Sequence, residues 1–317
     1  MQIMTVHGPI APKEAGFVLS LEHLICDLWS IIHSYDGILD DENLAIAEVM
    51  KYQQAGGKTI VEVSSVGLGR SPKSLRRISE HTGIHVVMGS GWYREEVYPQ
   101  YIHEMSTNEL AGKIVEDLTV GADGTDIRAG LIGEIGTERY HITPAQERVF
   151  RAAARAQKKT GVSIWTHTTH FGELALEQIA LLQEEGVPSH RIVISHLGDR
   201  FGATHFQAIA DKGVYLGIDN IGYIGAGYPD DEVRARNIVE LIAGGHEDQL
   251  LLSLDVCMKQ HLHSYGGKGY DHLQRKFLPL LVKAGVGPER LTKMTVTNPA
   301  RALSYKEASE KTMKDEK

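Results

Sequence analysis

The segment TPAQERVFRAAARAQKKTGVSIWTHT, residues 143–168, predicts a helix followed directly by a strand. Thr143 is a capping residue before Pro144 at the first helical position, and Gly161 is a typical helix stop. The run VSIWTHT (162–168) that follows is short and mostly apolar, as a buried strand is. A chain built from such units joins its strands through helices, which produces parallel strands.

Seven other runs share this character: they are rich in Val, Ile and Leu and are separated by segments with helical spacing. In chain order the eight predicted strands are Gly16–His23, Lys58–Ser64, His85–Ser90, Arg128–Gly136, Val162–Thr168, Arg191–His196, Val214–Asp219 and Gln249–Asp255. Eight strand–helix units, apolar on both faces, favour a closed (β/α)₈ barrel over an open doubly wound sheet. The absence of a GxGxxG motif after the first strand also disfavours the open sheet. We predict an α/β protein with one (β/α)₈ TIM-barrel domain over residues 1–305 and a frayed polar tail over 306–317.

The composition is that of an ordinary globular protein, with 317 residues of which 42% are hydrophobic and 23% charged. A net charge of -8 disfavours nucleic acid and anionic membranes as partners. The two cysteines, Cys26 and Cys257, form no CxxC pair, so neither a disulfide framework nor a thiolate zinc site is supported. No signal peptide or membrane span is evident. We expect a cytoplasmic protein that acts on a small-molecule substrate.

Five predicted strands end in, or contain near their ends, a residue that can bind a metal: His23, Glu134, His167, His196 and Asp255. In a (β/α)₈ barrel these positions converge at the mouth, where active sites lie. One such residue could simply cap a helix, but five together indicate a site. Three imidazoles and two carboxylates suit Zn²⁺ or another divalent first-row ion. A carboxylate shared by two ions would permit a binuclear centre.

The chain resembles the phosphotriesterase family of the amidohydrolase superfamily from Val6 to Leu303. The motifs that carry the resemblance are SLEHL (20–24), GEIGTE (133–138), THTTHFGE (166–173), SHLGDR (195–200), SLDVC (253–257) and VTNPARALS (296–304). The stretch YGGKGYDHL (265–273) is similar to the branch called phosphotriesterase-related proteins. The resemblance implies a (β/α)₈ barrel with a metal centre at its mouth, and a homodimer.

The resemblance also implies roles for four of these ligands. His167 and His196 would bind the more exposed ion, Asp255 the more buried one, and Glu134 would bridge them where many members have a carboxylated lysine. We expect one or two Zn²⁺ ions per chain, with Mn²⁺, Co²⁺ or Fe²⁺ as alternatives. In hydrolysis Asp255 would take the proton of the attacking water and deliver it to the leaving group.

One position departs from the family pattern. The family has His-x-His at the end of the first strand, whereas this chain has Leu21-Glu22-His23. Because side chains alternate along a strand, Glu22 should point outward into the helix layer and not replace the missing imidazole. Three alternatives follow: two ions with one weakened, one ion, or a pocket that binds ligands without catalysis.

Residues near the third and sixth strands are candidates for substrate binding. Trp92, Tyr93 and Arg94 place two aromatic rings and a cation beside the predicted centre, and Tyr93 corresponds by resemblance to a substrate-orienting tyrosine of lactonases. Arg94 and Arg200 could hold an anionic group, or form ion pairs within their loops. We predict a metal-dependent hydrolase of small-molecule esters, lactones or amides, with phosphotriester cleavage at most promiscuous. The alternative is a catalytically impaired barrel that binds a small ligand.

Overall fold

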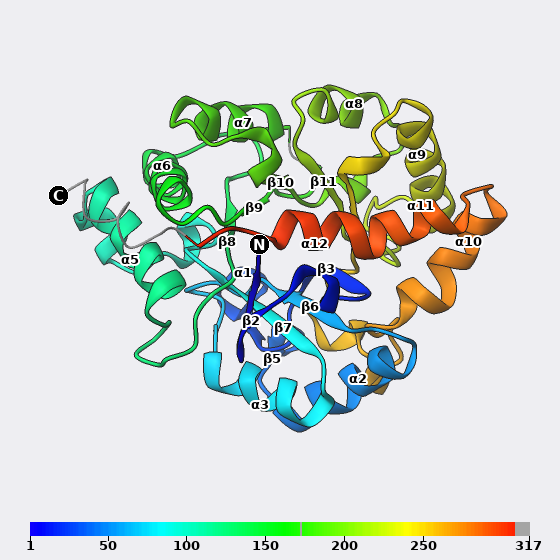
Figure 1. Ribbon diagram of the computed structural model, residues 1–317, viewed down its shortest axis with the longest axis horizontal. Coiled ribbons are helices and arrows are strands. Elements are labelled where there is room, and N and C mark those ends of the chain that lie inside the picture. Colours follow the sequence, from blue (N-terminus) through cyan, green and yellow to red (C-terminus); the bar gives the residue numbers. More distant parts are fainter. Residues whose placement is uncertain (172, 308–317) are drawn as a thin grey trace.

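Eight parallel strands form the centre of the molecule in a computed structural model that describes residues 1–171 and 173–307 (Figure 1). Each strand pairs with the next one along the chain, in the order β12-β11-β10-β9-β8-β7-β6-β3. The strands are β3 (Val18–Glu22), β6 (Thr59–Glu62), β7 (His85–Ser90), β8 (Leu131–Gly136), β9 (Ile164–His167), β10 (Ile192–Ile194), β11 (Tyr215–Ile218) and β12 (Leu250–Leu252). All eight predicted strands are confirmed, most of them shorter than predicted.

Helices connect the strands and surround the sheet (Figure 1). The longer helices are α2 (Glu42–Gln54), α3 (Pro72–Thr82), α5 (Thr107–Thr119), α6 (Pro144–Thr160), α7 (Ala175–Glu184), α8 (Thr204–Ala210) and α9 (Asp231–Ala243). The shorter helices are α1 (Trp29–Ile32), α4 (Tyr101–Glu104), α10 (Leu278–Lys283), α11 (Pro288–Thr292) and α12 (Asn298–Leu303). Two small antiparallel pairs join β1 (Ile3–Thr5) with β2 (Gly8–Ile10) and β4 (Cys26–Asp27) with β5 (Ile38–Leu39). The signals in the opening segment are confirmed: Thr143 caps α6 and Gly161 ends it with a φ of 77°. Within the described residues no helix is long and apolar enough to cross a membrane.

The barrel closes between its first and last strands, partly through one side chain. The Glu22 carboxylate accepts hydrogen bonds from Ser253 Oγ at 2.6 Å and from the backbone N–H groups of Leu254 and Val256 at 2.8 Å each. The prediction that Glu22 points into the helix layer is therefore wrong, because its carboxylate lies between β3 and the end of β12. A register irregularity between Leu19 and Glu22 interrupts the simple alternation on which that prediction depended.

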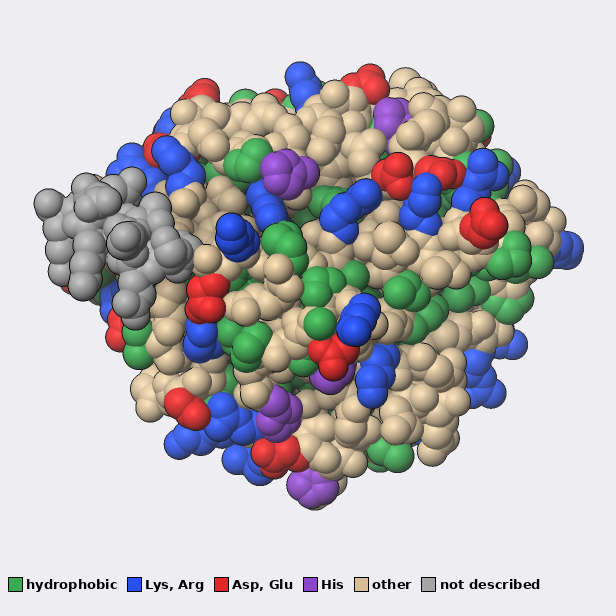
Figure 2. Space-filling model, in the orientation of Figure 1, with side chains coloured by type: hydrophobic (Ala, Val, Ile, Leu, Met, Phe, Trp, Pro, Cys, Tyr) green, Lys and Arg blue, Asp and Glu red, His purple; other side chains and the backbone are tan. Residues whose placement is uncertain are grey.

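Apolar side chains fill the interior of the barrel and its amino-terminal end. Leu21 is buried among them, together with residues such as Val61 and Trp165. Helix α12 contributes Ala302 and Leu303 to the same cluster and crosses the end of the barrel (Figure 1). On the face seen in Figure 2, charged side chains of both signs are scattered around apolar ones.

The two ends of the described chain meet at this closed end. Gln2 and Tyr305 exchange backbone hydrogen bonds of 2.9 and 3.0 Å. The predicted polar tail lies outside the described residues from position 308 onward, and Glu307, just before it, forms an ion pair with Arg128 at 2.9 Å.

Candidate metal centre at the mouth of the barrel

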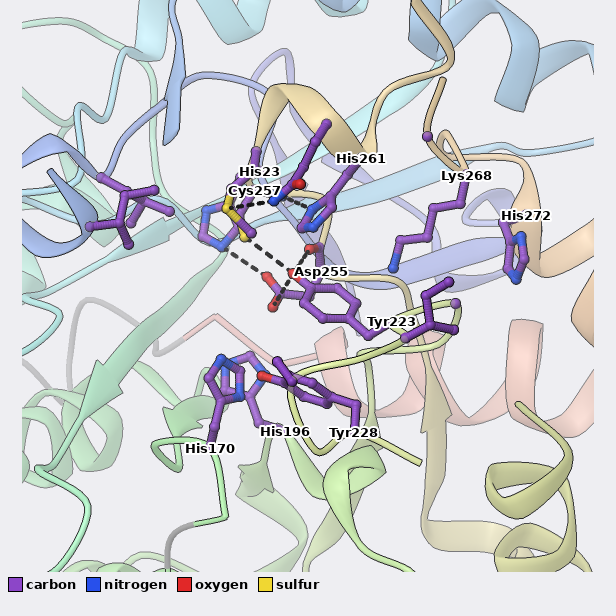
Figure 3. A pocket seen from close by; sticks show the side chains of 18 of the residues that line it. His23, His170, His196, Tyr223, Tyr228, Asp255, Cys257, His261, Lys268 and His272 are labelled. Carbon is purple, nitrogen blue, oxygen red and sulfur yellow. Dashed lines mark hydrogen bonds and ion pairs between the residues drawn. The ribbon is translucent and has the colours of Figure 1, made fainter. Parts of the chain in front are cut away.

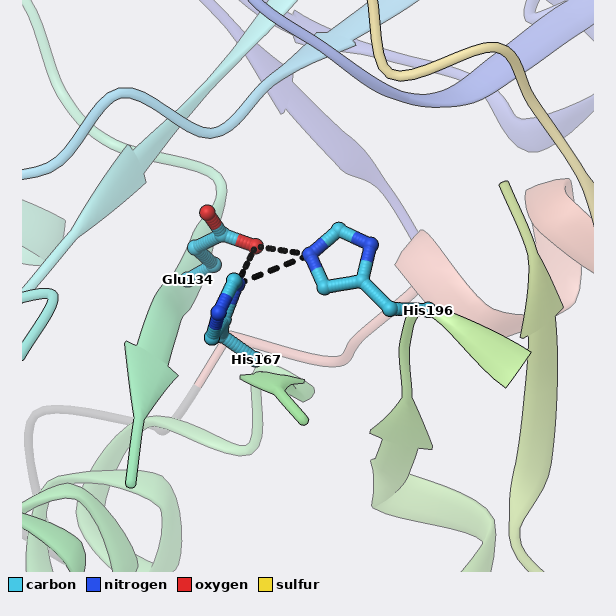
Figure 4. Close-up of side chains that lie close together, drawn as sticks. All are labelled: Glu134, His167 and His196. Carbon is cyan, nitrogen blue, oxygen red and sulfur yellow. Dashed lines mark hydrogen bonds and ion pairs between the residues drawn. The ribbon is translucent and has the colours of Figure 1, made fainter. Parts of the chain in front are cut away.

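Three metal-binding side chains converge at the carboxyl ends of β8, β9 and β10 (Figure 4). Glu134 Oε2 lies 3.2 Å from His196 Nε2 and 3.4 Å from His167 Nδ1, and the two ring nitrogens are 2.8 Å apart. All three side chains are buried. Gly136 leaves room for this cluster, because a Cβ there would lie 3.1 Å from His167 Cβ. The arrangement offers one carboxylate oxygen and two imidazole nitrogens within 4.8 Å of one another.

The surroundings of these side chains fit a bound cation. The Asp219 carboxylate lies 2.9 Å from His196 Nδ1, which directs that ring N–H to Asp219 and turns Nε2 toward the cluster. Tyr93 Oη likewise lies 3.1 Å from His167 Nε2 and leaves Nδ1 facing the cluster. Two imidazole lone pairs and a carboxylate oxygen at these distances repel one another unless a proton or a metal ion lies between them. The donor set therefore suits a divalent ion such as Zn²⁺.

The other two predicted ligands lie on the opposite side of Glu134. His23 Nε2 is 3.5 Å from Asp255 Oδ1 and 4.0 Å from Glu134 Oε1, and His23 Nδ1 is 2.8 Å from Ser64 Oγ. The structure thus brings all five predicted ligands together, with Glu134 between the two halves. Leu21 occupies the position of the first histidine in the family's His-x-His motif, and its side chain offers no donor atom to this half.

The charges of the cluster depend on one another. Burial disfavours a charged His196, but the carboxylates of Asp219 and Glu134 outweigh it and raise the pKa of His196 well above its usual value. Burial also opposes the charge of Glu134, yet His167 and His196 hold the pKa of this carboxyl well below its usual range. Burial lowers the pKa of His167 to about 4, so this imidazole is neutral at physiological pH.

Metal binding is expected to weaken as the pH falls through the raised pKa of His196, because the metal must displace a proton from that ring. His167 should add to this dependence only near its pKa of about 4. Calorimetric Zn²⁺ titrations in buffers of different ionisation enthalpy should show release of about one proton per ion. Asp219→Asn, which removes an anion that raises the pKa, should release less. Equal proton release by both proteins would contradict this account.

A cavity of about 1020 Å³ opens above the metal-binding side chains. Figure 3 shows His23, Asp255 and Tyr223 on one side of it and His170, His196 and Tyr228 on the other. Apolar residues also line it, namely Leu28, Ile31, Ile32, Ile224, Met258 and Leu280. A polar cluster of potential ligands at the base of a partly apolar cavity is the arrangement of a small-molecule enzyme site.

Comparison with known proteins agrees with this interpretation as an enzyme site and covers the whole barrel. The model of the phosphotriesterase family matches residues 1–303. The chain belongs to this family. It is 34% identical to the phosphotriesterase homology protein of Escherichia coli, over 90% of this chain and 97% of that protein. It is 32% identical to an N-acetyltaurine hydrolase of Danio rerio, over 95% of this chain and 90% of that protein. The crystal structure of a Listeria monocytogenes lactonase superposes with a TM-score of 0.90 at 30% identity, covering 97% of this chain and 100% of that one.

Membership of the phosphotriesterase family makes the protein a hydrolase with a TIM-barrel fold. The resemblance inferred from the motifs is therefore confirmed, as is the predicted fold. The comparisons also favour the predicted enzyme over the alternative of a barrel that only binds a ligand.

Two of the four predicted substrate-binding residues line the cavity of this phosphotriesterase family member. Tyr93 lies beside His167, and Arg94 stands above the Tyr93 ring at 5.5 Å from its centroid. Arg94 also contacts Glu96 at 3.1 Å and Glu138 at 3.8 Å. The alternative of ion pairs within the loop therefore applies to Arg94, although the residue remains at the cavity wall.

Trp92 and Arg200 lie elsewhere. The Trp92 side chain is buried, and its indole N–H donates to Tyr101 Oη at 2.9 Å. Arg200 lies 3.3 Å from the Asp199 carboxylate. The described residues that line the cavity include neither of them. Both predictions depended on sequence distance from a strand end, which does not specify the direction of a loop side chain.

Three further residues of the site were not singled out in the sequence. Asp219 directly follows β11, as other site residues lie at or just after their strand ends, so its position was a usable signal. Tyr223 and Lys268 lie on loops that follow β11 and β12 and line the cavity. His170, after β9, and His261, after β12, also line it.

Proposed function

We propose that the protein is a metal-dependent hydrolase of small-molecule esters, lactones or amides, and that Zn²⁺ is its native ion. The observation that carries the proposal is the Glu134–His167–His196 group beside Asp255 at the base of the cavity. A divalent ion held there would polarise the scissile carbonyl and lower the pKa of a water from about 15.7 toward about 7.

Asp255 is suited to handle the proton of the hydrolytic reaction. Burial opposes its charge, but His23 and His196 hold the pKa of Asp255 at about 2, so it is a carboxylate at neutral pH. Its Oδ1 faces His23 at 3.5 Å and its Oδ2 accepts a hydrogen bond from Tyr223 Oη at 3.1 Å. We assign to Asp255 the acceptance of a proton from the attacking water and its transfer to the leaving group.

The substrate class follows from the cavity and from the relatives. Relatives hydrolyse N-acetyltaurine, an amide, or a lactone, and both reactions require attack on a carbonyl carbon. A cavity of 1020 Å³ lies at the upper end of the usual range for ligand sites and has room for a larger acyl group than acetyl. The apolar wall formed by Ile31, Ile32 and Ile224 suits an aliphatic part of such a substrate. We propose phosphotriester cleavage only as a side activity.

The test is a hydrolysis screen of metal-free protein and of protein reloaded separately with Zn²⁺, Mn²⁺, Co²⁺ or Fe²⁺. The panel contains lactones, aryl esters and N-acyl amides, including N-acetyltaurine, with a phosphotriester as a comparison. We expect turnover in at least one carbonyl class that chelation abolishes and reloading restores. His196→Ala should not recover activity on reloading. Turnover that chelation does not affect would contradict the proposal.

A further inference from the structure

We infer that this chain holds a single metal ion, bound by Glu134, His167 and His196, and that hydrogen bonds organise the His23–Asp255 half in place of a second ion. The inference rests on the proposed function and deepens it. It departs from the two-ion centre that the family resemblance implies. It rests on Leu21, the position at which this chain lacks the first histidine of the family's His-x-His motif.

The first argument is the number of donor atoms. Among the residues that the structure describes, Glu134, His167 and His196 form the one group of three potential ligands. A second ion would depend on His23, Asp255 and the shared Glu134, because position 21 is a leucine packed in the apolar interior of the barrel. A leucine side chain has no atom that can bind a metal, so the second ion would have one ligand fewer.

Neighbouring side chains do not replace that donor. The Glu22 carboxylate is the nearest carboxylate in sequence, but it accepts three hydrogen bonds from the end of β12. Moving it to a metal would leave Ser253 Oγ and two backbone N–H groups buried without acceptors, which is unfavourable. Ser64 already contacts His23 Nδ1 at 2.8 Å.

The second argument is that both oxygens of Asp255 face protein groups. Oδ1 lies 3.5 Å from His23 Nε2, and Oδ2 lies 3.1 Å from Tyr223 Oη. The phenol also contacts the backbone oxygen of Asp255 at 2.7 Å and Cys257 Sγ at 3.3 Å. These contacts hold the Asp255 carboxylate in position (Figure 3).

Lys268 and His261 hold the Tyr223 ring in this position. Lys268 Nζ lies 4.1 Å from the centroid of the ring, and the His261 ring packs against it at a centroid distance of 4.7 Å with the planes inclined by 57°. Lys268 Nζ also donates to the backbone oxygens of Ile221 at 2.5 Å and Leu254 at 2.6 Å, which ties the loop after β11 to the end of β12. The arrangement of the His23–Asp255 half therefore depends on hydrogen bonds and ring contacts between three segments of the chain.

The experiment counts Mn²⁺ ions and detects whether they are neighbours. Chelated protein is titrated with Mn²⁺, freed of excess ion by gel filtration, and measured by elemental analysis and electron paramagnetic resonance. We expect about one ion per chain with the spectrum of isolated Mn²⁺. Two ions per chain with the spectrum of a spin-coupled pair would overturn the inference.

Leu21→His provides the matched gain of a ligand, and Leu21→Met is its apolar control. The histidine variant should bind a second Mn²⁺ and show a coupled pair, whereas the methionine variant should behave as the native chain does. A histidine variant that folds, as judged by circular dichroism, and still binds one ion would refute the role of Leu21. The native chain decides the ion count even if this variant does not fold.

Because ion counting requires no turnover, failure to find a substrate leaves the ion count unaffected. A coupled pair in an active enzyme would overturn the single-ion inference and leave the proposed function intact.

Discussion

Replacing Asp255 by asparagine is expected to lower kcat by about 10³-fold, because an amide cannot accept the proton of the attacking water. Asparagine has nearly the same shape, so the contact with Tyr223 and the closure of the barrel should persist. The measurement is steady-state kinetics on the best substrate of the hydrolysis screen, with thermal unfolding of both proteins followed by circular dichroism. Asp255→Asn should unfold at a temperature close to that of the native protein.

The control for this prediction is Cys257→Ser. Cys257 also lines the cavity and contacts Tyr223, but it has no assigned part in proton transfer. Its variant should keep kcat within about tenfold of the native value. Near-normal turnover of Asp255→Asn would disprove the role of this carboxylate in proton transfer.

Replacing Glu22 by alanine should lower the free energy of unfolding by about 3 kcal/mol or more, because three buried donors lose their acceptor. Without the carboxylate, Ser253 Oγ and the N–H groups of Leu254 and Val256 remain unpaired at the seam of the barrel, where β3 meets the end of β12. Denaturation with urea, followed by circular dichroism, measures the loss. Glu147→Ala is the control, since the partly exposed Glu147–Arg151 pair should contribute no more than about 1 kcal/mol.

Glu22 should also make stability depend on pH. Burial raises its pKa to about 7, so the folded protein favours the protonated form more than the unfolded chain does. The contribution of this group is therefore greatest below the pKa of the unfolded chain and declines as the pH rises toward about 7. Glu22→Gln should flatten that part of the stability profile.

A Glu22→Ala variant as stable as the control would show that the seam closes without this carboxylate.

The fold and the ligands could be predicted because both depend on local patterns. Apolar runs separated by helical segments determine the strands, and a polar residue at a strand end is directed to the mouth of the barrel. His23, Glu134, His167, His196 and Asp255 all satisfy that rule, and the structure brings them together.

What could not be predicted depends on contacts between distant segments. The direction of Glu22 follows from a register irregularity in β3 that simple alternation does not reveal. The role of Asp219 depends on which imidazole its carboxylate meets from the neighbouring strand. Trp92 lies on a loop, and only the packing against Tyr101 determines that its indole is buried away from the cavity.

The pairing of Gln2 with Tyr305 has a practical consequence for handling the protein. Because these residues are adjacent at the closed end of the barrel, a short peptide could join them and new termini could be cut in an exposed loop. Circular permutation of this kind is tolerated where chain ends are close together. The same geometry favours attachment to a solid support from this end, so that an immobilised preparation would present its open mouth to the solution.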